Sequence, residues 1–185
     1  MNKTTKFFLP FFFTFFFQYS VTNAQTSFPK IDKEKLKQIL DTSKARLNII
    51  TIFTNDCGGT AYMFETMQEL KEKFPGKILF IPCSSERETN EGDLKALLQK
   101  YQYQDVCYLI DGEKYKEKKS DTRFKGYQFR NDICNDCRID QIGVPYYLLV
   151  EPGRHILYAG YTAPGDFDRL MEYIMDSPLP IKAGH

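Results

Sequence analysis

The chain has 185 residues, 42% of them hydrophobic, and a formal net charge of +1 at neutral pH. This length suits one domain with a hydrophobic core of its own. The balanced charge gives no electrostatic reason to expect a nucleic acid or another strongly charged partner.

Residues 1–24 have the features of a signal peptide. Two lysines form a basic start, an apolar run follows over residues 7–17, and Ala24 is a small residue that suits cleavage after it. The apolar run is shorter than the roughly 20 residues that a membrane-spanning helix needs. We therefore expect export to the periplasm or beyond, a mature domain over residues 25–185, and no membrane span once the leader is removed. Removal takes away the two lysines and no acidic residue, so the net charge becomes −1.

The first half of the mature chain alternates between helix and strand patterns. Asp32 can cap a helix that runs to about Ser43. Three short apolar runs, residues 46–54, 77–83 and 106–110, have the composition of buried strands. Between them, apolar residues three and four apart predict two helices with inward-facing Met63, Met67, Leu70 and Phe74, and then Leu94, Leu97, Leu98 and Tyr101.

In the second half of the chain, the sequence pattern predicts helices and strands clearly only near the end. Residues 111–140 show no clean period, although one helical face is predicted from Phe124, Tyr127, Phe129 and Ile133. Residues 145–150 and 155–161 read as strands, and the turn between them predicts a β-hairpin. A last helix begins near Pro164. The pattern as a whole predicts an α/β fold, in which a mixed central sheet is flanked by helices.

Cys57 lies where a predicted buried strand turns into a helix. Open α/β sheets place ligands and reactive groups at this edge. The N–H groups and the dipole at a helix start stabilise a thiolate relative to a thiol. Gly58 and Gly59 leave room near the sulfur for another backbone or a bulky disulfide. We interpret Cys57 as a reactive thiol, and the alternative is a small cysteine buried in the core.

The chain has five cysteines, so at least one is unpaired within it. Cys134 and Cys137 have the Cys-x-x-Cys spacing, which admits three interpretations. The first is a structural disulfide, formed between these two or with Cys83 and Cys107. The second is a redox pair that resolves Cys57, and the third is half of a zinc site, which needs two further ligands. Cys83 and Cys107 lie in predicted strands, where core or disulfide roles are expected. No cofactor or metal is expected.

Over about residues 46–175 the order of these features resembles the thioredoxin-like superfamily. Cys57 matches the nucleophilic first cysteine of its Cys-x-x-Cys motif, and Val144-Pro145 matches its cis-proline loop. The resemblance implies a thioredoxin-like fold with an insert before that loop, and thiol–disulfide exchange on exported proteins. It also implies that Val144, Pro145 and the residue at position 60 contact the substrate.

One position departs from the family, because Thr60 stands where the second cysteine belongs. Threonine cannot resolve a mixed disulfide, so a complete exchange cycle needs another thiol. This leaves two further hypotheses, a non-catalytic binding protein with the same fold and a peroxiredoxin-like peroxidase. The peroxidase hypothesis uses Thr54, three residues before Cys57, but Ile50 stands where that family has a proline. Its arginine would be Arg123, Arg130 or Arg138. His155 and His185 are given no catalytic role.

Overall fold

The computed structural model describes residues 27–116, 123–135, 137 and 143–161. The predicted leader and the predicted C-terminal helix lie outside these residues. The elements, in chain order, are β1 (Lys30–Ile31), α1 (Lys33–Thr42), β2 (Leu47–Phe53), α2 (Gly58–Lys73), β3 (Ile78–Ser84), the short 3₁₀ helix η1 (Glu88–Asn90), α3 (Glu91–Lys100), β4 (Tyr108–Ile110), α4 (Arg123–Ile133), β5 (Tyr146–Val150) and β6 (Ile156–Gly160). None of the helices within the described ranges is long and apolar enough to span a bilayer.

Most of these elements agree with the sequence pattern. The carboxylate of Asp32 accepts a hydrogen bond from the backbone N–H of Lys35 at 2.8 Å, so it caps α1 as expected. Every residue of β2 is buried, as its β-branched run predicts. Strand β1 was not predicted, because two residues are too few to show a period. Strand β4 begins later than predicted, and Val106 is instead exposed.

The sheet of the described residues has six strands in the order β1-β4-β3-β2-β5-β6. Strands β1, β4, β3 and β2 run parallel, whereas β5 is antiparallel to both of its neighbours. Strand β5 therefore begins at the edge where β2 ends, and Ile52 pairs with Tyr146. This register makes the residues that follow β2 neighbours of the residues that precede β5. The pairing of β2 with β5 therefore places Cys57 and Pro145 at the same edge of the sheet.

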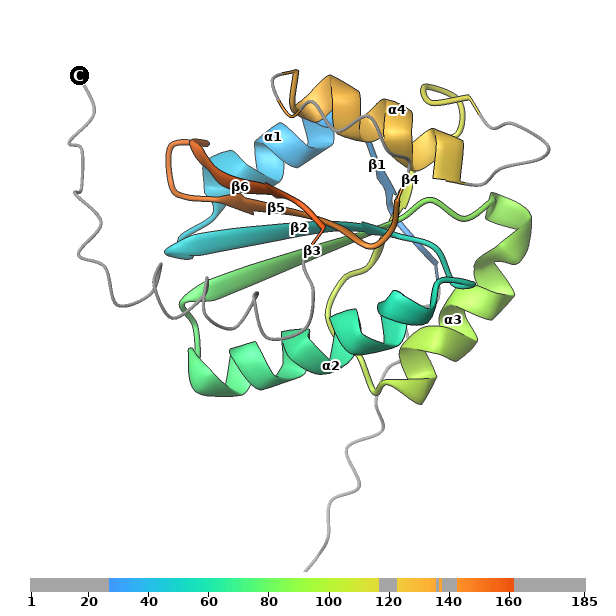
Figure 1. The fold of residues 1–185 in the computed structure, drawn as a ribbon, viewed down its shortest axis with the longest axis horizontal. Coiled ribbons are helices and arrows are strands. Elements are labelled where there is room, and N and C mark those ends of the chain that lie inside the picture. Colours follow the sequence, from blue (N-terminus) through green and yellow to red (C-terminus); the bar gives the residue numbers. More distant parts are fainter. Residues whose placement is uncertain (1–26, 117–122, 136, 138–142, 162–185) are drawn as a thin grey trace, which may run out of the picture.

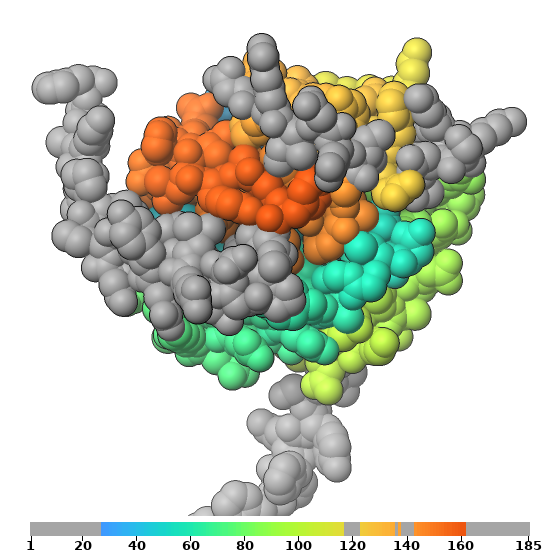
Figure 2. Space-filling model, in the orientation of Figure 1, coloured from blue at the N-terminus to red at the C-terminus, as the bar shows by residue number. Residues whose placement is uncertain are grey.

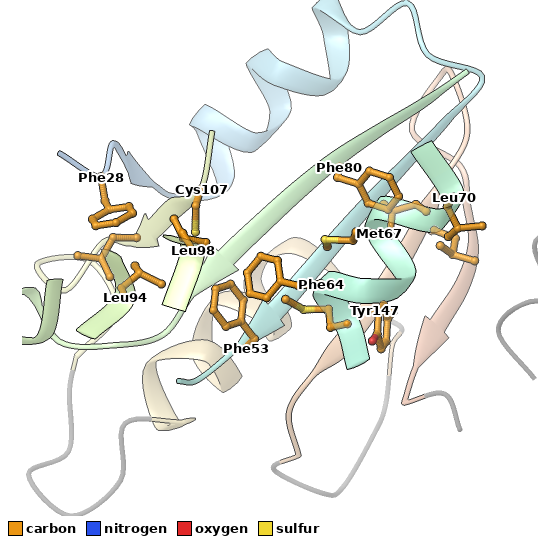
Figure 3. Packing of buried hydrophobic residues seen from close by; sticks show 14 of the residues in the cluster. Phe28, Phe53, Phe64, Met67, Leu70, Phe80, Leu94, Leu98, Cys107 and Tyr147 are labelled. Carbon is orange, nitrogen blue, oxygen red and sulfur yellow. The ribbon is translucent and has the colours of Figure 1, made fainter. Parts of the chain in front are cut away.

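Helices cover both faces of the sheet. Figure 1 shows α2 and α3 on one face and α1 and α4 on the other. Because strand side chains alternate, Phe53 of β2 packs toward α2, whereas Ile50 and Ile52 pack on the opposite side. Phe64 of α2 contacts the Phe53 ring edge-on, with 5.4 Å between centroids, in the cluster shown in Figure 3. Full burial of one such side chain contributes roughly 1.5–3 kcal/mol.

Helix α4 buries only part of the predicted face. Its buried residues are Lys125, Gly126, Phe129 and Arg130. Phe124 and Tyr127, which we predicted to face inward, are only half-buried. The reason is close packing at Gly126, where a Cβ would lie 2.8 Å from Ile52 and 3.1 Å from Ser85. The helix approaches the sheet through its smallest residue, with Phe129 buried as predicted and Phe124 and Tyr127 only partly covered.

Candidate functional site

Cys57 occupies the junction between β2 and α2. It is the N-cap of α2, with an extended backbone, and its carbonyl accepts the N–H of Thr60 at 3.0 Å. The side chain is half-buried and the thiol is free. In Figure 2 the start of α2, coloured teal, reaches the surface beside the β5–β6 hairpin, coloured orange. The predicted placement of Cys57 at a strand end and helix start is therefore present in the structure.

The structure brings Cys57 together with Val144 and Pro145. The Cys57 thiol donates a hydrogen bond to the Val144 carbonyl oxygen at 2.9 Å. The peptide bond between Val144 and Pro145 is cis. Gly59 faces the proline ring so closely that a Cβ on it would lie 2.8 Å from Pro145 Cδ. A glycine at position 59 thus allows the loop to approach the sulfur, as the sequence predicts.

The hydrogen bond to Val144 affects the charge of the sulfur. A carbonyl oxygen can accept a proton from a thiol, but it faces a thiolate with the same sign of charge. The contact therefore stabilises the thiol form, whereas the N–H groups at the start of α2 stabilise the thiolate. The balance between the two changes whenever another donor takes the Val144 carbonyl.

Thr60 lies on the inner side of this junction. Its side chain is buried, with 1% exposure, and its hydroxyl donates to the Thr54 carbonyl at 2.7 Å. The side chain points into the protein and contacts the backbone just after the end of β2. The expected contact between Thr60 and a substrate stays a prediction. The hydroxyl satisfies a backbone acceptor that would otherwise lack this partner.

The peroxidase hypothesis gains no support from the geometry. The Thr54 hydroxyl is buried and makes no hydrogen bond, so it does not contact the Cys57 sulfur as a donor. The Arg130 guanidinium lies over the rings of Tyr127 and Tyr146. Arg123 lies at an exposed position, and Arg138 is outside the described residues.

The other four cysteines lie away from this junction. Cys134 and Cys137 form a disulfide with each other, with 5.3 Å between their Cα atoms. They follow α4, and Cys134 packs in the cluster on the face opposite α2. Cys83 and Cys107 are fully buried and form no disulfide within the described residues, and burial raises the pKa of both thiols. Among the five cysteines, all within the described residues, Cys57 alone combines a free thiol with solvent access.

Two buried charged residues at this edge were missed in the sequence. The Glu86 carboxylate accepts the backbone N–H of Asn55 at 2.8 Å and the side-chain amide of Asn90 at 3.1 Å. The Lys125 ammonium donates to the Glu86 backbone carbonyl. These bonds attach the loop before Cys57 to the end of β3 and to α4. The only signal in the sequence was the missing apolar period around Lys125.

A buried tyrosine lies near Cys57. Tyr147 of β5 is buried, and burial raises its pKa well above the usual value, with smaller contributions from Tyr62 and Cys57. The described residues contain no group of three or more His, Cys, Asp or Glu that could hold a metal ion. His155 is exposed and lies 3.2 Å from the Glu151 carboxylate, far along the hairpin from Val144. The chemistry available at this junction is that of a single thiol.

Neither a protein-family model nor a curated protein matches the sequence. Solved structures do match. The thioredoxin domain of a thiol-disulfide oxidoreductase from Bacteroides vulgatus has a TM-score of 0.50 and 13% identity, over 71% of this chain and 81% of that one. A thiol-disulfide isomerase from Corynebacterium glutamicum has a TM-score of 0.50 and 11% identity, over 73% and 84%. A thioredoxin-like protein in its oxidised form has a TM-score of 0.52 and 9% identity, over 78% and 84%. At such identities the likeness concerns the fold.

Proposed function

We propose that this chain, which has a thioredoxin-like fold, performs thiol–disulfide exchange on exported proteins through Cys57. The observation that supports it best is the contact of a free, half-buried thiol at the start of α2 with Val144 and Pro145. The leader pattern over residues 1–24 supports substrates outside the cytoplasm, where protein disulfides persist.

The proposed reaction begins with deprotonated Cys57. Its sulfur attacks one sulfur of a substrate disulfide, a new S–S bond forms, and the other substrate sulfur leaves as a thiolate. Thr60 cannot break the mixed disulfide. In one route another thiolate of the substrate attacks the substrate sulfur of the mixed disulfide, which forms a different disulfide in the substrate and expels Cys57 as a thiolate without net oxidation. In the other route a small external thiol attacks the same sulfur and expels Cys57, and a second small thiol then releases the reduced substrate and leaves with the first as a disulfide. Resolution by Cys134 or Cys137 remains a prediction, and their mutual disulfide beyond α4 does not favour it.

Val144 and Pro145 are proposed to hold the substrate chain. A peptide N–H of the substrate can replace the Cys57 thiol as the donor to the Val144 carbonyl. The thiol then loses the contact that stabilises its protonated form, and the helix start favours the thiolate. Substrate binding would thereby activate the nucleophile. Pro145 has no N–H, and its ring packs against Gly59 beside the sulfur.

The test uses an aromatic disulfide that releases a coloured thiolate. The native protein is expected to release one equivalent rapidly and Cys57→Ser none, while Cys107→Ala, which removes a buried thiol, keeps the fast phase. The wild-type protein but not Cys57→Ser should also accelerate the rearrangement of a substrate with scrambled disulfides. Full activity in Cys57→Ser would exclude the proposal.

A binding protein that captures disulfides without turnover is the second candidate. It is favoured by Thr60, which fills the place of a second thiol with a buried hydroxyl. In that case the mixed disulfide with Cys57 accumulates and is not released by small thiols. Thr60→Cys would restore a resolving thiol, so it should release the captured partner. Rapid multiple turnover by the wild-type protein would reject this candidate.

A further inference from the structure

The loop that contacts Cys57 is held from the far side by a tyrosine. Tyr161 directly follows β6, and its hydroxyl oxygen accepts the backbone N–H of Gly143 at 2.7 Å. Gly143 directly precedes Val144, whose carbonyl accepts the Cys57 thiol. A single peptide unit therefore separates the bond to Tyr161 from the bond to the candidate nucleophile.

Close packing accompanies this hydrogen bond. A Cβ on Gly143 would lie 2.7 Å from Cε1 and 2.8 Å from Cζ of Tyr161, so the ring occupies the space that any larger residue would need. The same ring meets Tyr146 edge-on, with centroids 5.4 Å apart. The position of the Tyr161 hydroxyl is thus fixed by contacts on both the loop and β5.

A buried arginine fixes the hydroxyl from a third direction. Arg130 of α4 has 3% exposure, and its Nη1 donates to the Tyr161 hydroxyl at 3.4 Å. Its guanidinium lies over the ring of Tyr127 at 4.6 Å and the ring of Tyr146 at 5.1 Å. Two aromatic faces and a hydrogen bond hold a planar cation that a lysine cannot imitate.

We propose that Tyr161 and Arg130 are positioning residues, which hold the Val144 carbonyl against the Cys57 thiol and so set the reactivity of that thiol. If the Gly143 N–H loses its acceptor, the loop moves and the thiol loses its own acceptor. Cys57 then reacts faster with a small reagent, because the contact that stabilised its protonated form is gone. A peptide disulfide reacts more slowly, because Val144 and Pro145 no longer hold it in place. This second consequence rests on the proposed function, whereas the first does not.

The experiment compares Tyr161→Phe and Arg130→Lys with the wild-type protein. Alkylation of Cys57 by iodoacetamide is measured across a pH series, and exchange is measured with a peptide disulfide. We expect alkylation at neutral pH to rise by about fivefold in Tyr161→Phe, because the sulfur loses one hydrogen bond. The rate of peptide exchange should fall mainly through a higher KM. Asp56 directly precedes Cys57, and Tyr147 of β5 interacts electrostatically with Cys57 and with Tyr62 and Tyr158. Both variants leave these groups in place.

Tyr115→Phe is the matched control. It removes a tyrosine hydroxyl that donates to Asp132 of α4 at 2.6 Å, away from the loop. It should lower thermal stability without moving the alkylation profile of Cys57. The inference is overturned if Tyr161→Phe keeps the wild-type profile, or if Tyr115→Phe shifts the profile equally. If the wild-type protein exchanges no disulfide at all, the proposed function fails, and the alkylation profile still decides this inference.

Discussion

Gly58 and Gly59 are adjacent in the sequence, but only Gly59 lies against another part of the chain. A Cβ at position 59 would lie 2.8 Å from Pro145 Cδ and 3.7 Å from the Cys57 sulfur, whereas one at position 58 would have nothing within 4 Å. Neither glycine has a positive φ. A close approach to Pro145, rather than backbone freedom, therefore requires a glycine at position 59.

This difference gives a prediction with a built-in control. Gly59→Ala should lower the free energy of unfolding by about 1–3 kcal/mol, because the added methyl group forces the loop and the helix start apart. It should also slow the reaction of Cys57 with a peptide disulfide. Gly58→Ala should leave both quantities unchanged or raise the stability slightly, by up to about 1 kcal/mol, since alanine is the better helix former. Urea unfolding and the coloured disulfide assay measure the two effects. Equal losses in both variants would contradict the packing of Pro145 on Gly59.

Individual residues of the candidate site differ in how well the sequence predicts their contacts. Cys57, Val144 and Pro145 were identified from their order along the chain, and the structure places them in contact. Thr60 was identified by its place in the motif, but its side chain points inward. A motif gives the position of a residue on the backbone, whereas side-chain direction depends on which acceptor is near. Here that acceptor is the carbonyl of Thr54.

At the scale of elements, α4 was the hardest to predict. Its buried positions include Lys125, Gly126 and Arg130, which have no apolar signal. Each of them is buried against a partner from another part of the chain. Lys125 donates a hydrogen bond to the Glu86 carbonyl, Gly126 packs against the side chain of Ile52, and the guanidinium of Arg130 lies over aromatic rings. Strand β2 was predicted well because burial on both faces makes its sequence continuously apolar. Periodicity identifies elements packed by apolar groups and misses those packed by polar ones.

The disulfide beyond α4 gives a prediction at this scale. The backbone N–H of Cys134 bonds the Arg130 carbonyl at 3.0 Å, so the disulfide with Cys137 closes a very short loop at the helix end. Replacing both cysteines by alanine should lower the free energy of unfolding by about 2 kcal/mol, the amount that chain entropy assigns to a loop of this size. The first reaction of Cys57 with a small disulfide should keep its wild-type rate.

A reducing agent supplies the control for this double variant. It should lower the urea midpoint of the wild-type protein and leave that of the variant unchanged, because only the wild-type protein has this disulfide to lose. A variant of normal stability that reacts once at Cys57 but no longer turns over would contradict a structural role. It would instead assign Cys134 and Cys137 to the resolution of the mixed disulfide.

At the scale of the whole molecule, the site is assembled from segments that lie far apart in the sequence. The β2–β5 pairing brings Cys57 to Val144, and the β5–β6 hairpin then brings Tyr161 to Gly143. The hairpin was predictable from its turn, but the antiparallel pairing of β5 beside β2 sets the register, and register depends on the packing of both faces. This is why the sequence identified the candidate cysteine and missed the residues that contact the loop beside it.

The two buried thiols give a prediction for the molecule as a whole. Burial raises the pKa of Cys83 and Cys107 above the ordinary value of 9.0, so both stay protonated in the folded protein when the unfolded chain ionises. Below about pH 9 both states hold these protons, and the contribution to stability is fully present. Above that pH the unfolded state loses protons that the folded state keeps, so stability falls as pH rises. Each thiol makes the free energy of unfolding fall by about 1.4 kcal/mol per pH unit.

Urea unfolding between neutral pH and about pH 10, under anaerobic conditions, measures this slope, and the pH window follows from the ordinary thiol pKa. Buried tyrosines add to the fall as the pH approaches 10, where an unfolded tyrosine ionises, because burial raises the pKa of Tyr146 to about 12 and also raises the pKa of Tyr103, Tyr115 and Tyr147. Cys107→Ala removes one of these protons, so the free energy of unfolding should fall less steeply with pH than in the wild-type protein, by up to about 1.4 kcal/mol per pH unit. The cavity left by the thiol lowers the stability of the variant at every pH. Comparing slopes separates the effect of ionisation from the effect of lost packing. If the stabilities of the two proteins fell in parallel with pH, Cys107 would ionise equally in the folded and unfolded states. That result would contradict the full burial of this thiol next to β4.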